Sequence, residues 1–281
     1  MRAAWLRGRD HHELGAVETC TEGNAALALS IGGAKKVYAH TDANEDGALF
    51  ALGDGGTLLA VTDGHGGVDA SEAALACVRD TLAPGWTSKE VQLRGVWEAQ
   101  ALSGLAACEV AISKSAAAGG RRHSRTTLAL AVVRPAEGFL FFVSIGDSHL
   151  YQLRGPTALD LAGERSASGK LFFLGPGRGE PAALSEKCIL GAAPLAGVRA
   201  VVLATDGLSE RGVGVNNPAA TVAEVSAGAA GAPGMLRALE TSRALVQAAL
   251  DAQRRNASGD NVAAAVAWLE PEGNLDHRRA G

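Results

Sequence analysis

The chain has 281 residues, of which 47% are hydrophobic and 20% charged, so it can bury a sizeable core and global disorder is excluded. Its formal net charge is −4 and its Lys and Arg residues are scattered, which disfavours nucleic-acid binding as a main function. The longest apolar runs are far too short to span a bilayer, and no secretory signal follows Met1. We therefore expect a cytoplasmic protein that has no membrane partner.

The first predicted unit is a β-hairpin. Apolar runs at 48–52 and 57–62 flank Gly53-Asp54-Gly55-Gly56, and Asp-Gly supplies the positive φ angles of a tight hairpin turn. The sequence Asp63-Gly64-His65-Gly66-Gly67 follows the second strand directly. Apolar residues at helical spacing then predict helices at about 70–82 and 90–115.

Strand-like patterns return in the second half of the chain, at 126–133, 139–145, 149–153, 198–205 and 262–269. The first three have short connections, so we expect them to be antiparallel neighbours. Residues 155–197 are rich in Gly, Pro and Ala and predict an irregular, mobile surface segment. With a further helix at about 234–251, the order of elements predicts an α+β fold in which helices cover antiparallel sheet.

Aspartates stand at the ends of the predicted strands. Five share this placement: Asp46, Asp63, Asp147, Asp206 and Asp260. Like charges gathered at sheet ends would repel one another unless a cation neutralised them, and Mg²⁺ and Mn²⁺ prefer oxygen ligands. Aspartate is also common in ordinary turns. The pattern alone favours a metal site and ordinary turns about equally.

Six sequence motifs extend this pattern, in an order and at a spacing that resemble the metal-dependent protein serine/threonine phosphatases of type 2C, bacterial type. They are NEDGALF at 44–50, AVTDGHGG at 60–67, RTTLALAVV at 125–133, FVSIGDSHLY at 142–151, VVLATDGLSERG at 201–212 and ASGDNVAAAV at 257–266. The resemblance runs from about Ala26 to Leu269. It implies a four-layer αββα sandwich of two antiparallel sheets flanked by helices, with a metal site at the sheet edge.

The resemblance also implies one phosphatase domain over 1–281, with a core at about 24–270, a flap-like segment at 155–197 and short terminal tails. It implies two Mn²⁺ or Mg²⁺ ions and a weaker third. The residues that it assigns to the metals are Glu45, Asp46, Asp63, Gly64, Asp147, Asp206 and Asp260. Within this set Asp63 would bridge two ions, Gly64 would offer its carbonyl to one, and Asp206 with Asp260 would hold the other.

The reaction implied by the resemblance is direct attack on phosphorus by a water that bridges the two metals, with no Ser or Cys nucleophile. The residues assigned to catalysis are Asp63, His65, Asp206 and Asp260, with His65 as the acid for the departing oxygen. Asn261 would orient Asp260. The implied substrates are phosphoserine and phosphothreonine in proteins modified by a serine/threonine kinase, and we expect a monomer.

Three positions depart from the family pattern; at one of them, His149, where the family often has arginine, we expect only a local packing effect. A phosphate-binding arginine is expected four residues before Glu45, where this chain has Thr41, with His40 one residue earlier. We hypothesise that Arg125, which stands where the family has a small residue, partly replaces it, although a sheet-edge arginine is the commoner interpretation. Two rival functions stay open: a non-catalytic relative that binds phosphoproteins, and a phosphatase of small metabolites.

Overall fold

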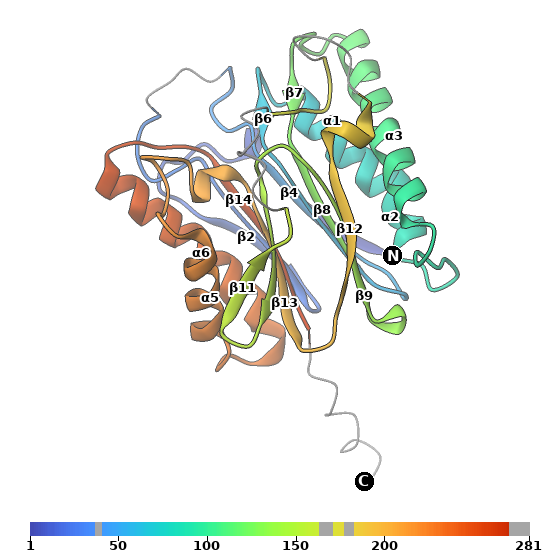
Figure 1. The fold of residues 1–281 in the computed structure, drawn as a ribbon. Coiled ribbons are helices and arrows are strands. Elements are labelled where there is room, and N and C mark those ends of the chain that lie inside the picture. Colours follow the sequence, from blue (N-terminus) through green and yellow to red (C-terminus); the bar gives the residue numbers. More distant parts are fainter. Residues whose placement is uncertain (37–40, 163–170, 177–182, 270–281) are drawn as a thin grey trace.

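The computed structural model of the protein describes residues 1–36, 41–162, 171–176 and 183–269. Two six-stranded antiparallel sheets lie face to face, with helices on the outer face of each (Figure 1). The expected α+β architecture, a four-layer αββα sandwich, is therefore confirmed. His40, residues 163–170 and 177–182 of the segment 155–197, and the C-terminal residues 270–281 lie outside the described residues.

The strands of the first sheet, in spatial order, are β1 (Arg2–Arg7), β4 (Gly47–Leu52), β5 (Thr57–Thr62), β8 (Leu128–Arg134), β9 (Phe139–Ile145) and β12 (Ile189–Pro194). Those of the second are β11 (Thr157–Asp160), β10 (His149–Arg154), β13 (Val198–Ala204), β14 (Val262–Trp268), β3 (Ala25–Ser30) and β2 (Glu18–Glu22). A short third pairing joins β6 (Gly64–His65) to β7 (Arg125–Thr126) beyond one end of the first sheet.

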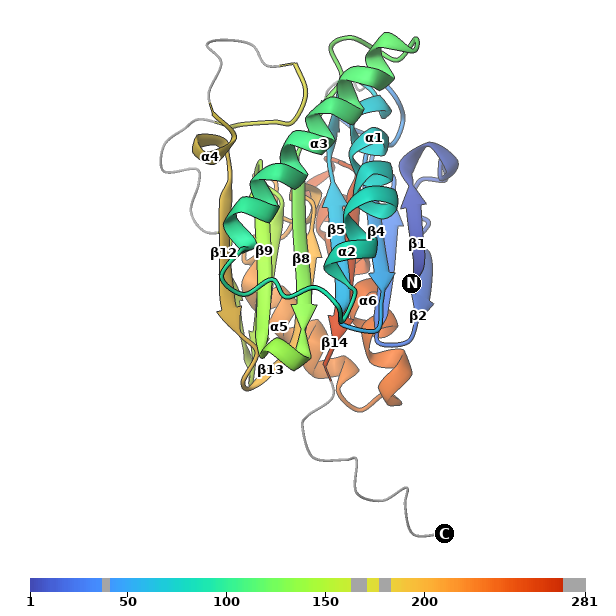
Figure 2. The ribbon, with the colours of Figure 1, turned by 90° about the vertical axis from the view of Figure 1, so that its right-hand side faces the viewer.

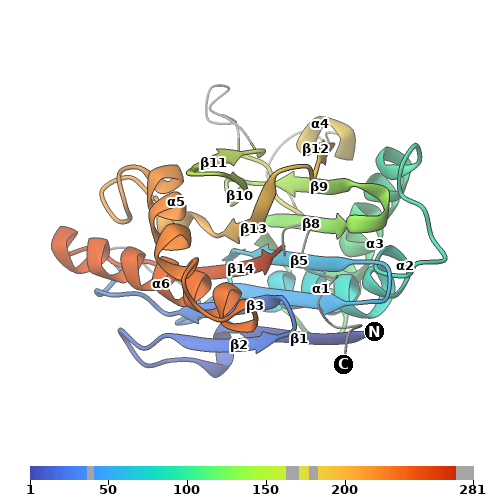
Figure 3. The ribbon, with the colours of Figure 1, turned by 90° about the horizontal axis from the view of Figure 1, so that it is seen from below.

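Two groups of helices form the outer layers. The helices over the first sheet are α1 (Asp69–Cys77), which continues through a π-helical turn at Val78–Leu82, α2 (Ala83–Trp86) and α3 (Trp97–Ala117). The helices over the second sheet are α5 (Pro218–Ala229) and α6 (Gly234–Asn256), and a short α4 (Leu184–Lys187) precedes β12. Figure 2 shows α1–α3 lying across the first sheet, and Figure 3 shows the layers from below.

The strand sequences are apolar on both faces because each sheet is covered on both sides. In β5, Leu58 and Ala60 belong to the cluster under α1 and α3, whereas Leu59 and Val61 belong to the cluster between the sheets. Successive side chains of a strand point to opposite faces, so a continuous apolar run fills two layers at once. A third cluster lies between the second sheet and α5 and α6.

The predicted hairpin is confirmed as β4 and β5, and the predicted pairing of β8 with β9 is also confirmed. The prediction that β9 and β10 are neighbours is wrong, because β10 pairs with β11 and β13 in the other sheet. Gly146, at φ 103°, turns the chain from one sheet to the other. The short connection crosses between layers, and it places Asp147 at the end of both sheets.

The predicted irregular segment at 155–197 is partly wrong, because β11, α4 and β12 lie within it. Both of these strands stand at sheet edges, where pairing on one side permits a weaker apolar pattern. The predicted short N-terminal tail is also wrong, since β1 and β2 are the opposite edge strands. Neither of them was predicted from the sequence, and nor was β3.

The predicted helix at 90–115 begins only at Trp97. The backbone N–H groups of Leu93 and Arg94 instead donate to the Glu137 carboxylate, which holds this stretch as a loop. Helix α5 was not predicted, although Asn217 accepts a hydrogen bond from the Ala220 N–H as its N-cap and proline follows directly.

Two smaller features concern the cysteines and the helices. All four cysteines are free, and Cys77 and Cys108 are buried between α1 and α3. Among the helices of the described residues, none combines enough length with enough apolar character to cross a bilayer.

Candidate metal centre

Five aspartates from both sheets meet at one end of the sandwich. Asp46 directly precedes β4, Asp63 joins β5 to β6, and Asp147 lies in the crossing from β9 to β10. Asp206 follows β13 and begins a 3-10 turn, and Asp260 precedes β14. The charges of the other four aspartates lie close enough to Asp63 to raise the pKa of its carboxyl group. The strand ends therefore bring together the aspartates that the sequence pattern singled out.

Three of these aspartates converge most closely. One carboxylate oxygen from each of Asp63, Asp147 and Asp206 lies within 4.8 Å of the other two. Asp63 is buried, Asp206 half-buried and Asp147 exposed, so the cluster opens to solvent on the Asp147 side. Asp46 and Asp260, also buried, lie on its inner side.

The electrostatics of the cluster oppose ionisation of its members. Burial, followed by the neighbouring Asp206 and Asp46, raises the pKa of Asp63 well above its ordinary value. Burial, followed by Asp147 and Asp260, does the same to the pKa of Asp206. For Asp46, burial and then Asp260 raise the pKa from 3.8 to about 7. Without a cation, these carboxylates hold protons that aspartates in water would lose.

The donor set fits a hard divalent cation. The converging ligand atoms are carboxylate oxygens, without thiolate or imidazole among them, as Mg²⁺ and Mn²⁺ prefer. A divalent charge would also offset the repulsion that raises the three pKa values. The open side at Asp147 leaves room for water or substrate to complete the coordination.

Hydrogen bonds from the paired threonines hold the backbone of Asp63. The Thr126 hydroxyl and the Thr127 backbone N–H both donate to the Asp63 carbonyl, at 2.9 Å each. The Asp63 N–H donates in turn to Thr127 Oγ1 at 3.0 Å. No role was assigned to this Thr-Thr pair from the sequence. In the structure the pair holds the Asp63 backbone and thereby helps to position the Asp63 carboxylate.

Close backbone approach explains two of the glycines beside the aspartates. A Cβ atom on Gly64 would lie 2.7 Å from the Glu45 carbonyl oxygen, and one on Gly207 only 1.7 Å from that of Asn261. Larger residues at these positions would push the strand ends apart. On the inner side, Thr205 Oγ1 donates to Asp46 Oδ2 at 2.7 Å and fixes that carboxylate.

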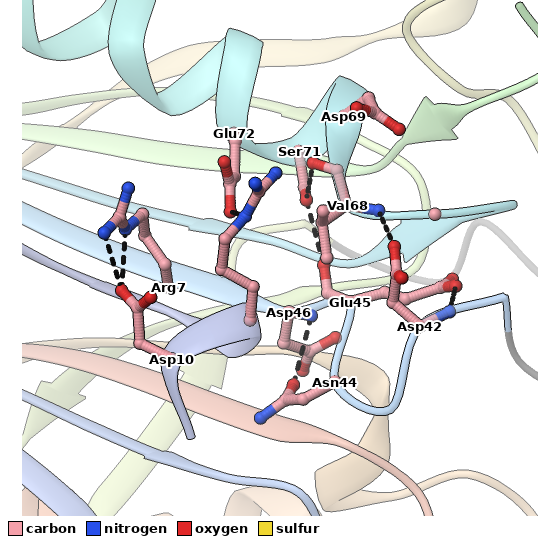
Figure 4. Close-up of polar contacts among 12 residues, drawn as sticks. Arg7, Asp10, Asp42, Asn44, Glu45, Asp46, Val68, Asp69, Ser71 and Glu72 are labelled. Carbon is pink, nitrogen blue, oxygen red and sulfur yellow. Dashed lines mark hydrogen bonds and ion pairs between the residues drawn. The ribbon is translucent and has the colours of Figure 1, made fainter. Parts of the chain in front are cut away.

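Glu45 is turned toward the loop that precedes it (Figure 4). Its Oε1 accepts hydrogen bonds from the backbone N–H groups of Thr41 and Asp42, at 2.9 and 2.8 Å. Thr41 is exposed and adds no cationic group. Ser71, near the start of α1, donates to the Glu45 carbonyl at 2.9 Å, so the loop is tied to the helix as well.

Asn261 connects three chain segments at the inner side of the cluster. Its backbone N–H donates to Asp260 Oδ1 at 2.8 Å. Its side-chain oxygen accepts from the Glu45 N–H at 2.9 Å, and its amide nitrogen donates to the carbonyls of Ile31 and Ala43 at 3.1 Å. The expected contact with Asp260 is thus made by the backbone, while the side chain positions the loop that carries Glu45 and Asp46.

His65 and Arg125 face each other across the β6–β7 pairing. His65 Nδ1 lies 3.6 Å from Asp63 Oδ2. Burial lowers the pKa of His65, the Asp147 carboxylate raises it in part, and Arg125 lowers it. The Phe173 ring contacts both, at 4.6 Å from the His65 ring and 4.3 Å from the Arg125 guanidinium carbon. Phe173 was missed because its sequence surroundings carry no regular pattern.

Comparison with known proteins agrees with this arrangement. The family model described as Protein phosphatase 2C matches residues 35–242. Among curated proteins, no match was found.

Solved structures share the fold at low sequence identity. The serine/threonine phosphatase PstP/Ppp of Mycobacterium tuberculosis is 21% identical, with a TM-score of 0.60 over 91% of this chain and 100% of that one. The phosphatase Stp1 of Staphylococcus aureus is 19% identical, with a TM-score of 0.62 over 94% and 100%. A serine-threonine phosphatase 2C from Toxoplasma gondii is 17% identical, with a TM-score of 0.63 over 96% and 99%. With the family model matched over most of its length, this chain belongs to the protein phosphatase 2C family of serine/threonine phosphatases.

Proposed function

We propose that this protein removes phosphate from phosphoserine and phosphothreonine in proteins, using two Mn²⁺ or Mg²⁺ ions and a weaker third. The observation that carries the proposal is the convergence of the Asp63, Asp147 and Asp206 carboxylates within 4.8 Å. Each belongs to a different motif of the family pattern. Hydrophobic packing of the sheets cannot account for three mutually repelling acids at one point.

In this proposal Asp63 would contribute to holding both ions, the Gly64 carbonyl would help to hold one, and Asp206 and Asp260 would help to hold the other. Asp147 would help to hold the third ion, and Asp46 and Glu45 would act as ligands directly or through water. When bound, the ions would supply a water of lowered pKa and offset the charge of the phosphoryl group. Hydrogen bonds from Thr126, Thr127 and Thr205 hold Asp63 and Asp46 in place.

His65 is the proposed acid for the departing serine or threonine oxygen. Its buried Nδ1 has no hydrogen-bond partner among the described residues and lies beside Asp63, so the ring could exchange a proton at the edge of the cluster. Burial lowers its pKa, and the nearby Asp147 carboxylate acts in the opposite sense. The dianionic phosphoryl group of a substrate would further favour the protonated ring.

The substrates proposed are proteins phosphorylated by a serine/threonine kinase, acted on by a monomer with one catalytic domain. One described part of the flap-like segment lies where a protein substrate would bind. Leu174 exchanges two backbone hydrogen bonds with Thr126, at 3.0 and 2.8 Å. This pairing places Phe173 beside His65, where it could contact the peptide that carries the phosphate.

Comparison of substrates in the presence of millimolar Mn²⁺ tests the proposal. We expect hydrolysis of para-nitrophenyl phosphate that is lost with chelator, restored by Mn²⁺ and absent in Asp206→Asn. Phosphopeptides should exceed sugar phosphates and nucleotides in kcat/KM by roughly 100-fold. A preference for small metabolites would move the assignment to a metabolite phosphatase. Mn²⁺ binding without turnover on any substrate would favour the phosphoprotein-binding relative.

Replacing Arg125 by alanine tests its proposed part in substrate binding. We expect the KM for a phosphopeptide to rise about tenfold with little change in kcat, because a guanidinium beside the cluster would contact the phosphoryl group before and during reaction alike. Arg122→Ala is the matched control, since that arginine is exposed three residues earlier. An unchanged KM in Arg125→Ala would reduce Arg125 to a residue that packs on Phe173.

A further inference from the structure

A lysine that no motif includes lies against the metal centre. Lys36, at the end of the first described stretch of the chain, forms a parallel β-bridge with Gly259, the residue before Asp260. The adjoining Gly259 N–H donates to the Lys35 carbonyl at 3.0 Å. This pairing runs the Lys36 backbone beside the turn that carries Asp260, and the Lys36 side chain is only 12% exposed.

The ammonium group of Lys36 points at the inner side of the cluster. Its Nζ lies 3.5 Å from Asp260 Oδ1 and donates a hydrogen bond to Asn261 Oδ1. Burial lowers the pKa of Lys36, and four carboxylates oppose that effect: those of Asp260, Asp46, Glu45 and Asp63. A lysine held this way places a positive charge within reach of the acids that would bind metal.

The charges around the centre therefore fall into two groups. The Asp63, Asp147 and Asp206 oxygens converge on a common point without Asp260. Asp260 instead has the Lys36 ammonium beside it. A divalent ion held by Asp206 and Asp260 would meet a positive charge at close range, whereas an ion on the Asp147 side would lie farther from it.

We propose that Lys36 is the resident counter-ion of Asp260 and weakens the binding of the divalent cation on the Asp260 side of the centre. The proposal rests on the proposed metal-dependent function. In the metal-free protein Lys36 offsets part of the repulsion among the buried acids. When the ion binds, its charge and that of Lys36 repel each other, so Lys36 sets how much free metal the enzyme needs.

Lys36→Gln tests this proposal because glutamine can still donate to Asn261 Oδ1 but carries no charge; Lys36→Arg is the control that keeps the charge. The measurement is calorimetric titration of chelator-stripped protein with Mn²⁺ alone, without substrate. For the class of sites on the Asp260 side, identified as the class that Asp260→Asn removes, we expect Kd to fall roughly tenfold in Lys36→Gln and to stay within about threefold of wild type in Lys36→Arg. Equal affinity in wild type and Lys36→Gln would overturn the proposal.

A thermal-unfolding series adds a readout that does not depend on turnover. Stripped Lys36→Gln should unfold at a lower temperature than wild type, and saturating Mn²⁺ should remove the difference. If the single variant does not fold without metal, the double variant Lys36→Gln/Asp260→Asn should recover stability, because both charges are then gone. Failure of the double variant to recover would show that the two charges do not compensate each other, and would also overturn the proposal.

The same proteins distinguish a counter-ion from a phosphate-binding lysine. If Lys36 instead binds the phosphoryl group of the substrate, Lys36→Gln should weaken competitive inhibition by inorganic phosphate and leave the Mn²⁺ affinity unchanged, which contradicts the proposal. If neither wild type nor Lys36→Gln binds Mn²⁺, the metal-dependent function itself fails and the role of Lys36 fails with it. Wild-type binding of Mn²⁺ with no change in the variant leaves that function standing and removes only the role of Lys36.

Discussion

Replacing Asp63 by asparagine is expected to lower Mn²⁺-dependent kcat/KM by a factor on the order of 10³ while making the metal-free protein more stable. Activity falls because Asp63 is the acid proposed to bridge the two ions. Stability rises because burial and four other aspartates raise the pKa of Asp63, which favours the unfolded state at neutral pH, and asparagine has no ionisation to oppose. The backbone bonds of Asp63 to Thr126 and Thr127 do not involve the carboxylate and should persist.

Phosphopeptide kinetics and thermal unfolding in chelator together test this expectation. Asp80→Asn is the matched control, because Asp80 is an exposed aspartate paired with its neighbour Arg79 on the helical side of the first sheet. It should change neither property. A variant at Asp63 that retained more than about a tenth of the wild-type rate would exclude Asp63 as the bridging ligand.

The stability of the metal-free protein should fall as the pH rises. The folded protein holds protons on Asp46 up to about pH 7, whereas an aspartate in the unfolded chain loses its proton near 3.8. Below 3.8 both states are protonated and Asp46 contributes nothing. Between these two pKa values only the unfolded state ionises, so the free energy of unfolding falls as the pH rises. Above about 7 both states are ionised and the loss of folding stability stays constant. For Asp46 alone, the free energy of unfolding falls by on the order of 4 kcal/mol across this pH range. The raised pKa values of Asp63 and Asp206 act in the same direction.

Thermal unfolding near pH 5 and pH 8, with chelator or with Mn²⁺, measures this dependence. We expect Tm in chelator to be roughly 10 °C lower at the higher pH. Mn²⁺ should raise Tm mainly at the higher pH, because the ligands must be ionised to bind it. Asp46→Asn keeps an acceptor for Thr205 and should weaken the pH dependence in chelator, with the remainder due to Asp63 and Asp206. A metal-free Tm that rose with pH would contradict the idea that the buried acids repel one another.

The positions of strands were easier to predict from the sequence than the strands with which they pair. The run Phe139–Ile145 was predicted with the observed limits, since a run of seven residues of which six are apolar suits a strand covered on both faces. The next strand was assigned to the wrong neighbour. A short connection brings two strands close, but Gly146 and the packing of two separate sheets decide that β10 pairs with β13.

In the candidate site, too, some residues could be predicted from the sequence and others could not. The motifs identified Asp46, Asp63, Asp147, Asp206 and Asp260, because each acid is followed or preceded by a local turn that leaves a mark in the sequence. The supporting residues left weaker marks. Thr205 was not singled out, nor was Phe173, because the contacts that define their roles are made with residues far away in the chain.

By itself the sequence determined the α+β class, the positions of most central strands and the acids at their ends, since all of these follow from local pattern and composition. The tertiary structure decided which sheet each strand joins and which acids converge. It also decided that Glu45 turns toward Thr41 and that Lys36 stands beside Asp260. The physical reason is that burial and charge at such a site are set by residues more than 200 positions apart, such as Lys36 and Asp260, and no local pattern encodes their distance.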